Sequence, residues 1–272
     1  MDLIKLLVYS NIWIALAVSF FTWQSYILLN LKENWIILGL VFFSTLFAYN
    51  FQRLVKLGKI EYTYNPRTQW IKENSVFLFI LSGISLVASI VLGLMLSYKE
   101  LFYLGGLSLI SIFYAQSFLK SKQFSLRDIP GLKIYLIAFV WAGTALLPIV
   151  NQFEFTLSTL LLFLEKFIFI LAITIPFDIR DLKFDTVKLK TIPQLIGVNG
   201  AKVLSVLLMF VYLALLIKNY EVEGYKSILI FLPIALFGII LSNKKRPELY
   251  YTGLLDGLIV LQGILVVVEH NI

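Results

Sequence analysis

Nine apolar segments of membrane-spanning length dominate this sequence. They cover approximately residues 4–29, 34–54, 75–97, 101–119, 132–151, 155–177, 201–218, 226–243 and 250–268. A helix needs about 20 mainly apolar residues to cross about 30 Å of hydrocarbon, and backbone groups in lipid must be satisfied within the element. Since no segment alternates as a membrane β-barrel strand does, the sequence predicts an all-α integral membrane protein, one domain with a bundle of nine transmembrane helices.

The composition excludes several classes of function. Hydrophobic residues make up 60% of the chain and charged residues 14%, far from the usage of soluble domains. The chain has no cysteine, which excludes disulfides, thiolate metal sites and a cysteine nucleophile. The one histidine, His270, is three residues from the C-terminus. Histidine-based catalysis is therefore not expected.

The basic residues are partitioned by side of the membrane. Lys166 lies within a segment, and of the other lysines and arginines only Lys32, Lys99, Lys218 and Lys226 fall on the side opposite the N-terminus. Such a bias places the N-terminus in the cytoplasm and the C-terminus outside, and we expect a bacterial cytoplasmic membrane. The net charge of +7 therefore indicates topology and anionic headgroups, and not a nucleic-acid partner.

Three aspartates follow the sixth segment at helical spacing. Asp178, Asp181 and Asp185 stand at i, i+3 and i+7, so a continuing helix would place them within one arc, with Lys188 on the same side. Clustered carboxylates suit a hard divalent ion, and Mg²⁺ is usually bound by one or two carboxylates together with a substrate phosphate. The alternative is a solvated helix end in which Asp and Lys alternate for solubility.

The loop after the second segment has a related pattern. Asn50, Arg53 and Leu57 repeat the i, i+3, i+7 spacing of the aspartates. A pseudo-repeat whose halves each present a polar helix end to one cavity is common in membrane proteins. We therefore expect two pseudo-repeat halves, roughly 1–125 and 126–272.

These residues resemble a known family. DIRDLKFDTVKLKTIPQLIG, residues 178–197, resembles the second aspartate-rich motif of the UbiA superfamily of intramembrane prenyltransferases. Asn50 and the segment 65–68 are similar to parts of its first motif, and residues 111–143 are similar to its loop between the fourth and fifth helices. The resemblance covers nearly the whole chain and implies a UbiA-like bundle.

The resemblance also implies a reaction and a set of roles. A polyprenyl group would pass from its diphosphate to a lipophilic, aromatic, quinone-precursor-like acceptor, with Mg²⁺ on Asp178, Asp181 and Asp185. We expect Asp181, Asp185 and Arg53 to be catalytic. Around the substrate we expect Asn50, Arg67, Lys120, Arg127, Lys188 and Lys190.

The first motif departs from the family pattern. Phe51, Arg53 and Leu57 stand where the family carries aspartates, so a first metal cluster is missing. In one interpretation Arg53, with Lys56, contacts the diphosphate directly and replaces one metal ion. In the other, the chain is a non-catalytic lipid- or quinone-binding protein, or a transporter, with the same bundle.

Four further polar residues lie in or near spans. Asn11 is either a cavity-facing residue or a partner in a helix–helix hydrogen bond, and Asp256 is a secondary pocket residue. Glu165 and Lys166 point about 100° apart as neighbours on a helix, so each is expected to need a partner on another helix or water. They either line the acceptor end of a cavity or lock the bundle.

Overall fold

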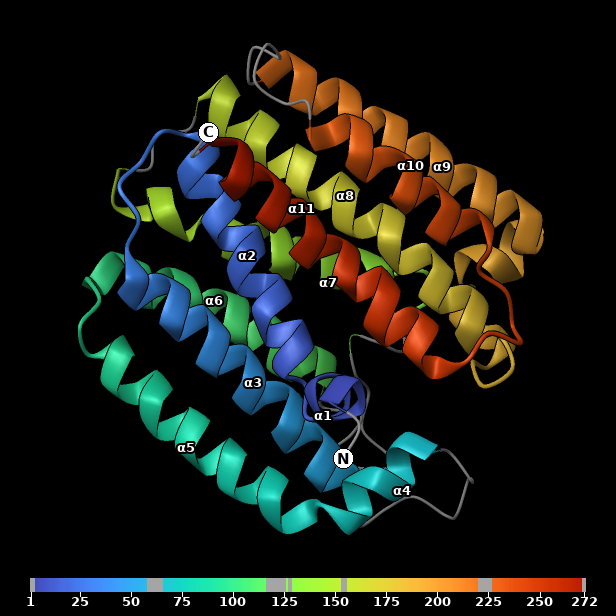
Figure 1. The fold of residues 1–272 in the computed structure, drawn as a ribbon, viewed down its shortest axis with the longest axis horizontal. Coiled ribbons are helices and arrows are strands. Elements are labelled where there is room, and N and C mark those ends of the chain that lie inside the picture. Colours follow the sequence, from blue (N-terminus) through green and yellow to red (C-terminus); the bar gives the residue numbers. More distant parts are fainter. Residues whose placement is uncertain are drawn as a thin grey trace.

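The protein is a bundle of helices running in nearly the same direction (Figure 1). The computed structural model describes residues 3–57, 66–115, 126, 129–152, 156–219 and 227–270. Within these ranges it is entirely helical. The α-helices are α1 (Leu3–Tyr9), α2 (Ile12–Leu28), α3 (Trp35–Leu57), α4 (Pro66–Glu73), α5 (Ser75–Gly93), α6 (Tyr98–Ala115), α7 (Lys133–Ala145), α8 (Leu157–Asp181), α9 (Ile192–Asn219), α10 (Ser227–Ile240) and α11 (Asp256–His270). Two 3₁₀-helices, η3 (Leu147–Gln152) and η4 (Val187–Leu189), and one π-helix, η6 (Tyr250–Leu255), complete the described part.

Several helices have the length and apolarity of membrane spans. Among the described residues five qualify, and the bent pair of α1 and α2 makes a sixth if it counts as one span. The five are Trp35–Val55, Ser75–Gly93, Leu157–Asp181, Ile192–Lys218 and Tyr250–Glu269, while α7 and α10 are shorter apolar helices. This confirms an integral membrane protein. Each of the nine segments expected from the sequence overlaps at least one helix.

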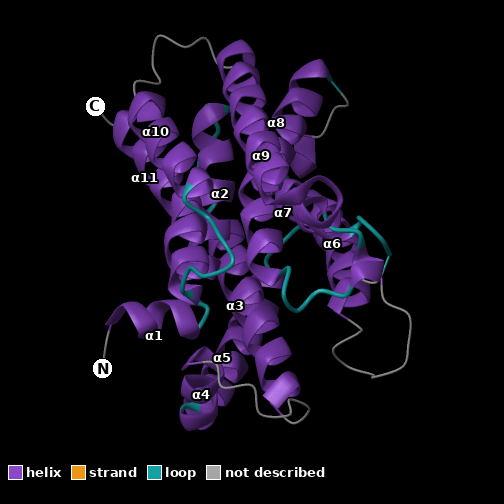
Figure 2. Cartoon of the chain, turned by 90° about the vertical axis from the view of Figure 1, so that its right-hand side faces the viewer, coloured by secondary structure: helices purple, strands orange, loops and turns teal. Residues whose placement is uncertain are grey.

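The first expected span is not one continuous helix, which corrects the expectation for residues 4–29. α1 and α2 meet at an angle of 69°, and α1 lies across the end of the bundle (Figure 2). The break is at Asn11, whose φ of 62° and ψ of 11° are left-handed. Asparagine tolerates this conformation better than most L-residues, so the residue type explains the position of the bend.

α2, α8 and α11 occupy the middle of the bundle, while α5 lies at one edge beside α3, and α9 and α10 lie at the opposite edge (Figure 1). The outward side chains of α5, including Val76 and Phe79, are more than 70% exposed. Such an apolar surface has no favourable contact with water and fits lipid. The interior is apolar as well, with aromatic side chains at its centre.

The aromatic centre joins five helices. Phe169 of α8 packs against Phe21 of α2, Tyr212 of α9 and Phe231 of α10, with ring centroids 5.7, 5.0 and 5.8 Å apart. Trp141 of α7 lies 6.4 Å from Phe21. Aromatic pairs at these separations gain contact energy beyond the burial of their area. This packing leaves little room for water in the middle of the bundle.

Local sequence explains several helix boundaries. The hydroxyl of Thr156 accepts a hydrogen bond from the Thr159 backbone N–H, and the Thr156 N–H donates to the Thr159 hydroxyl, so a capping box begins α8. Gly197 interrupts the first turns of α9 with a φ of 74° that glycine adopts without strain. The seventh expected span therefore begins earlier than residue 201, beyond a kink.

A pair of buried charges lies in the middle of α8. The Nζ of Lys166 is 3.4 Å from Oε1 of Glu165, and both side chains are fully buried. The expectation that these neighbours do not pair is therefore wrong, because the long lysine side chain bends toward the carboxylate. Lys166 also donates to Gln24 of α2 over 2.6 Å and lies 4.8 Å from the ring centroid of Phe21. The pair thus connects α8 to α2.

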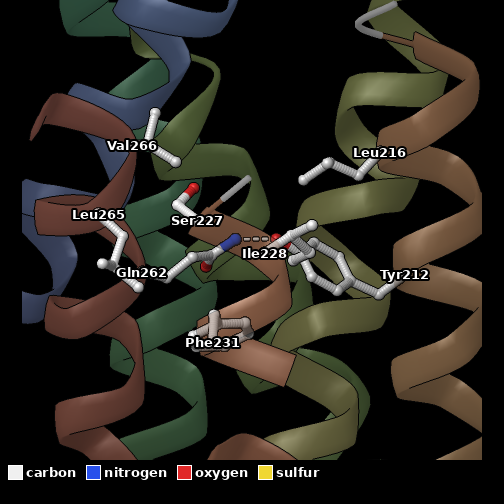
Figure 3. A pocket seen from close by; sticks show the side chains of 8 residues that line it. All are labelled: Tyr212, Leu216, Ser227, Ile228, Phe231, Gln262, Leu265 and Val266. Atoms are coloured by element: carbon white, nitrogen blue, oxygen red, sulfur yellow. Dashed lines mark hydrogen bonds between the residues drawn. The ribbon is translucent and has the colours of Figure 1, made fainter. Parts of the chain in front are cut away.

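A second polar contact lies at the wall of a small pocket between α9, α10 and α11 (Figure 3). Gln262 of α11 and Tyr212 of α9 point toward one another, and the Gln262 amide donates to the Tyr212 hydroxyl. Ser227 lines the same pocket and donates to Glu269. Since apolar residues make up the rest of the lining, these contacts act chiefly to satisfy buried polar groups.

We predict that Lys166→Met destabilises the protein by about 3–5 kcal/mol, because it leaves Glu165 buried without its cation. The measurement is the free energy of unfolding in detergent, titrated with SDS. Lys218→Met is the matched control, since Lys218 is exposed near the end of α9 and its loss is expected to change little. Equal stability of Lys166→Met and wild type would contradict the role given to the pair.

Candidate active site

The three aspartates lie together at the C-terminal end of α8. Asp178 and Asp181 belong to the last turns of the helix. Asp185 follows the helix, but the backbone N–H groups of Phe184 and Asp185 donate to the Asp181 carbonyl over 2.8 and 2.9 Å. Because these bonds continue the helical turn, the Asp185 side chain returns to the side that carries the other two.

The carboxylates surround the ammonium of Lys133, the first residue of α7. Its Nζ lies 2.8 Å from Oδ1 of Asp178, 3.4 Å from Oδ2 of Asp181 and 3.3 Å from Oδ2 of Asp185. The side chains of Lys133, Asp178 and Asp185 are at most 10% exposed. Three like charges this close repel one another, so the ammonium between them is what allows them to be buried together.

This arrangement bears on whether the aspartates fit a metal ion. Among the described residues, no group of three or more Asp, Glu, His or Cys side chains stands as a ready metal site. The donor type nevertheless suits Mg²⁺, which prefers oxygen ligands, and all three carboxylates reach a single point. The residues therefore fit a divalent ion at the position that Lys133 Nζ occupies.

Backbone contacts between two loops fix the start of α7 beside this cluster. The N–H of Gly131 donates to the Leu189 carbonyl over 2.8 Å, and Gly131 has a φ of 74°. The side chain of Gln194 accepts from the Thr191 N–H and donates to the Thr186 carbonyl. These bonds hold the segment after α8 in place, so the position of Lys133 relative to the aspartates is set by the backbone.

Arg180 continues the charged surface toward α11. Its Nε lies 2.8 Å from Oδ1 of Asp181. Its guanidinium lies 5.2 Å from the ring centroid of Phe177 and 5.4 Å from that of Tyr251, within the range of cation–π attraction. Tyr251 belongs to the π-helix η6, an irregularity often found at functional sites.

A second polar network joins α2, α3 and α4 at the same end of the bundle. The Asn11 amide donates to Asn50 over 2.7 Å, and the Asn50 amide donates to the Ser10 carbonyl over 3.0 Å. Arg67 donates to the Asn11 side-chain oxygen over 2.8 Å and lies 3.0 Å from Glu248. The helix break at Asn11 thus brings together Asn50 and Arg67, two residues expected from the sequence.

Arg53 and Asp256 lie between the two clusters. Arg53 interacts electrostatically with Arg67, Glu248 and Arg180. Asp256 interacts electrostatically with Arg180 and Arg67. Because Arg180 also contacts Asp181 directly, the arginines of the first loop and the aspartates of α8 form one charged region, which we call the charged mouth.

Other expected residues lie apart from this region or outside the described part. Lys188 and Lys190 are exposed on and beside η4. Lys120 and Arg127 fall outside the described residues, as does Asn65, and nothing follows here for their roles.

Three residues of the charged mouth were not predicted as site residues from the sequence: Lys133, Arg180 and Glu248. Lys133 counted there as one of many topological charges, and its contact with Asp178 spans 45 residues. Glu248 is 181 residues from Arg67. The available signal was the position of Lys133 at the very start of an apolar helix, which is too common to single it out.

Solved structures share this fold. An apo UbiA homologue from Aeropyrum pernix K1 has a TM-score of 0.63 at 15% identity, covering 94% of this chain and 96% of its own. A digeranylgeranylglyceryl phosphate synthase gives 0.56 at 17% identity over all of both chains. A UbiA homologue from Archaeoglobus fulgidus, bound to DMAPP and Mg²⁺, gives 0.55 at 13% identity over 97% of this chain and 99% of its own.

No family model matches the sequence, and no curated protein is significantly similar to it. The likeness to solved structures extends over nearly the whole chain at low identity, and such a likeness establishes the fold. The UbiA-like bundle expected from the sequence is therefore confirmed.

We predict that Asn11→Ala is less stable than Asn11→Gly by about 1 kcal/mol. Both changes remove the hydrogen bonds to Asn50 and Arg67, which together are worth about 1–3 kcal/mol. Only alanine adds the strain of a left-handed backbone. The measurement is unfolding in detergent for both variants and wild type, and the reverse order of stability would show that the bend does not require this conformation.

Proposed function

We propose that this chain is a membrane prenyltransferase that moves a polyprenyl group from its diphosphate to a lipophilic acceptor of aromatic, quinone-precursor type. The observation that carries the proposal is the charged mouth at one end of an apolar, aromatic-cored bundle. Buried ionisable groups in a membrane protein generally mark a functional site. The shared fold supports the proposal, because one structure with this fold holds DMAPP and Mg²⁺, and another holds GPP and Mg²⁺.

The metal ion of the proposed reaction is Mg²⁺, held by Asp178, Asp181 and Asp185. When bound, it would neutralise the negative charge that builds on the diphosphate as the bond to the prenyl carbon breaks. Asp181 and Asp185 are the proposed catalytic ligands, and the orientation of Asp181 is fixed by its contact with Arg180.

The balance of charge in the mouth supports a requirement for an added cation. Its described members are the cations Arg53, Arg67, Lys133 and Arg180 and the anions Asp178, Asp181, Asp185, Glu248 and Asp256. A diphosphate would add several negative charges to a region where acids already outnumber bases. Since unpaired charge is costly when buried, the donor is expected to bind together with a divalent ion.

Side chains of both loops are proposed to bind the diphosphate. Arg53, Arg67 and Arg180 lie within the mouth, and guanidinium groups bind phosphate oxygens in a bidentate manner. Asn11, Asn50 and Asp256 are proposed to shape the wall of the site. Lys120, Arg127, Lys188 and Lys190 are proposed to supply further positive charge around the entrance.

The bundle is proposed to protect the reactive carbon. Exclusion of water prevents capture of a carbocation-like prenyl group, and the aromatic centre around Phe169 has the chemistry to do this. In this proposal nine helices span a bacterial cytoplasmic membrane, with the N-terminus and the charged mouth inside and the C-terminus outside. The halves 1–125 and 126–272 then face each other across the site.

A second candidate is a non-catalytic lipid- or quinone-binding protein, or a transporter. The residues at the first-motif positions favour it, since Phe51, Arg53 and Leu57 supply no carboxylate there. The two functions differ in one product. Only the transferase releases inorganic diphosphate when prenyl diphosphates and a membrane extract are supplied with Mg²⁺, and absence of release by folded protein with every donor would favour this second candidate.

We predict that Asp181→Asn weakens Mg²⁺-dependent binding of GPP at least tenfold, because it removes one of the charges that hold the ion while keeping the size of the side chain. The measurement is calorimetric titration of the purified protein in detergent with and without Mg²⁺. Glu73→Gln is the matched control, since Glu73 is an exposed carboxylate on α4. Wild-type affinity in Asp181→Asn would reject the metal assignment.

A further inference from the structure

The ammonium of Lys133 and a divalent ion cannot occupy the aspartate cluster together. Nζ stands 2.8–3.4 Å from an oxygen of each of the three carboxylates. Mg²⁺ requires its oxygen ligands at about 2.1 Å, and the point that all three carboxylates reach is the one that Nζ fills. Entry of the ion therefore requires that Nζ move away.

The side chain of Lys133 can move while its backbone stays in place. The backbone is fixed by the bond between Gly131 and Leu189 and by the start of α7. The ammonium is joined to it by a flexible four-carbon chain with freely chosen rotamers. Lys133 therefore differs from Arg180, whose guanidinium is held between an aspartate and two aromatic rings.

Displacement of the ammonium has a cost and a compensation. Moving it away from three carboxylates loses three close charge contacts, which opposes binding of a metal ion alone. A diphosphate at the mouth offers the displaced ammonium new phosphate oxygens, since lysine binds phosphate as a point charge. Metal and diphosphate together are therefore favoured over either alone.

We propose that Lys133 is an internal cation that holds the aspartate cluster ready, gives way to the divalent ion, and then turns to the diphosphate. The inference rests on the proposed function and adds a positioning role for a residue outside the aspartate motif. Lys133 keeps three carboxylates buried and close in the empty protein, and it raises the metal concentration needed until donor is present. Coupling between two ligands is reciprocal, so metal and diphosphate each strengthen the binding of the other.

The test measures metal binding without turnover. Mn²⁺ is titrated by electron paramagnetic resonance into the purified full-length chain in detergent, with no donor present. Lys133→Met is expected to bind Mn²⁺ at least tenfold more tightly than wild type. Lys183→Met is the matched control, since Lys183 is exposed on the same segment as the aspartates and removes the same charge from a distance. It is expected to bind Mn²⁺ as wild type does.

A second titration adds GPP. The Mn²⁺ affinity of wild type is expected to rise at least tenfold with GPP, and that of Lys133→Met is expected to rise less. Adding Asp181→Asn to Lys133→Met is expected to remove the gained affinity, which places the ion at the cluster. Lys133→Arg keeps the positive charge and is expected to bind Mn²⁺ alone as weakly as wild type, so it tests the proposal if Lys133→Met does not fold.

Two results would overturn the proposal. One is Mn²⁺ binding by Lys133→Met, or by Lys133→Arg if the first variant is unfolded, that departs from these expectations. The other is equal coupling between Mn²⁺ and GPP in wild type and Lys133→Met. If GPP binds to no variant at any Mn²⁺ concentration, the proposed function fails, while the titration without donor still decides whether Lys133 competes with the ion.

Discussion

Charge buried in an apolar bundle must be paired, and this constraint organises the end of the molecule that carries the charged mouth. The three carboxylates stay together because Lys133 lies among them. Arg67 is held by Asn11 and Glu248 in the same way. Removing one member of such a group leaves its partners uncompensated in a medium of low dielectric. Loops far apart in the sequence are therefore bound to one another by their charges.

The same constraint explains why the two polar regions differ in character. The pair of Glu165 and Lys166 lies deep in the bundle, fully buried beside Gln24 and aromatic rings. The charged mouth lies at a helix end, where Asp181 and Arg180 remain 20% and 24% exposed. Deep pairs hold helices together, whereas partly accessible groups can exchange partners. The mouth is thus the region where charged ligands are able to enter.

The sequence predicted the features that depend on local pattern. Apolar length located the helices, and spacing brought Asp178, Asp181 and Asp185 to one side. It did not predict the bend at Asn11, since a left-handed residue inside an apolar run leaves hydropathy unchanged. It also missed the contact of Lys133, because partners far apart in the chain are set by tertiary packing. The adjacent pair in α8 was misjudged because backbone direction was considered without side-chain reach.

The π-helix before α11 makes that part of the chain intolerant of deletions. It accommodates Tyr250–Leu255 in a turn wider than that of a regular helix. Loss of one residue there would turn everything downstream by about 100° about the helix axis. Gly257 and Gly263 would then leave the close approaches to Trp13 and Phe20 that only their lack of a side chain permits. Natural length variants of this protein are therefore expected to change elsewhere than in this wide turn.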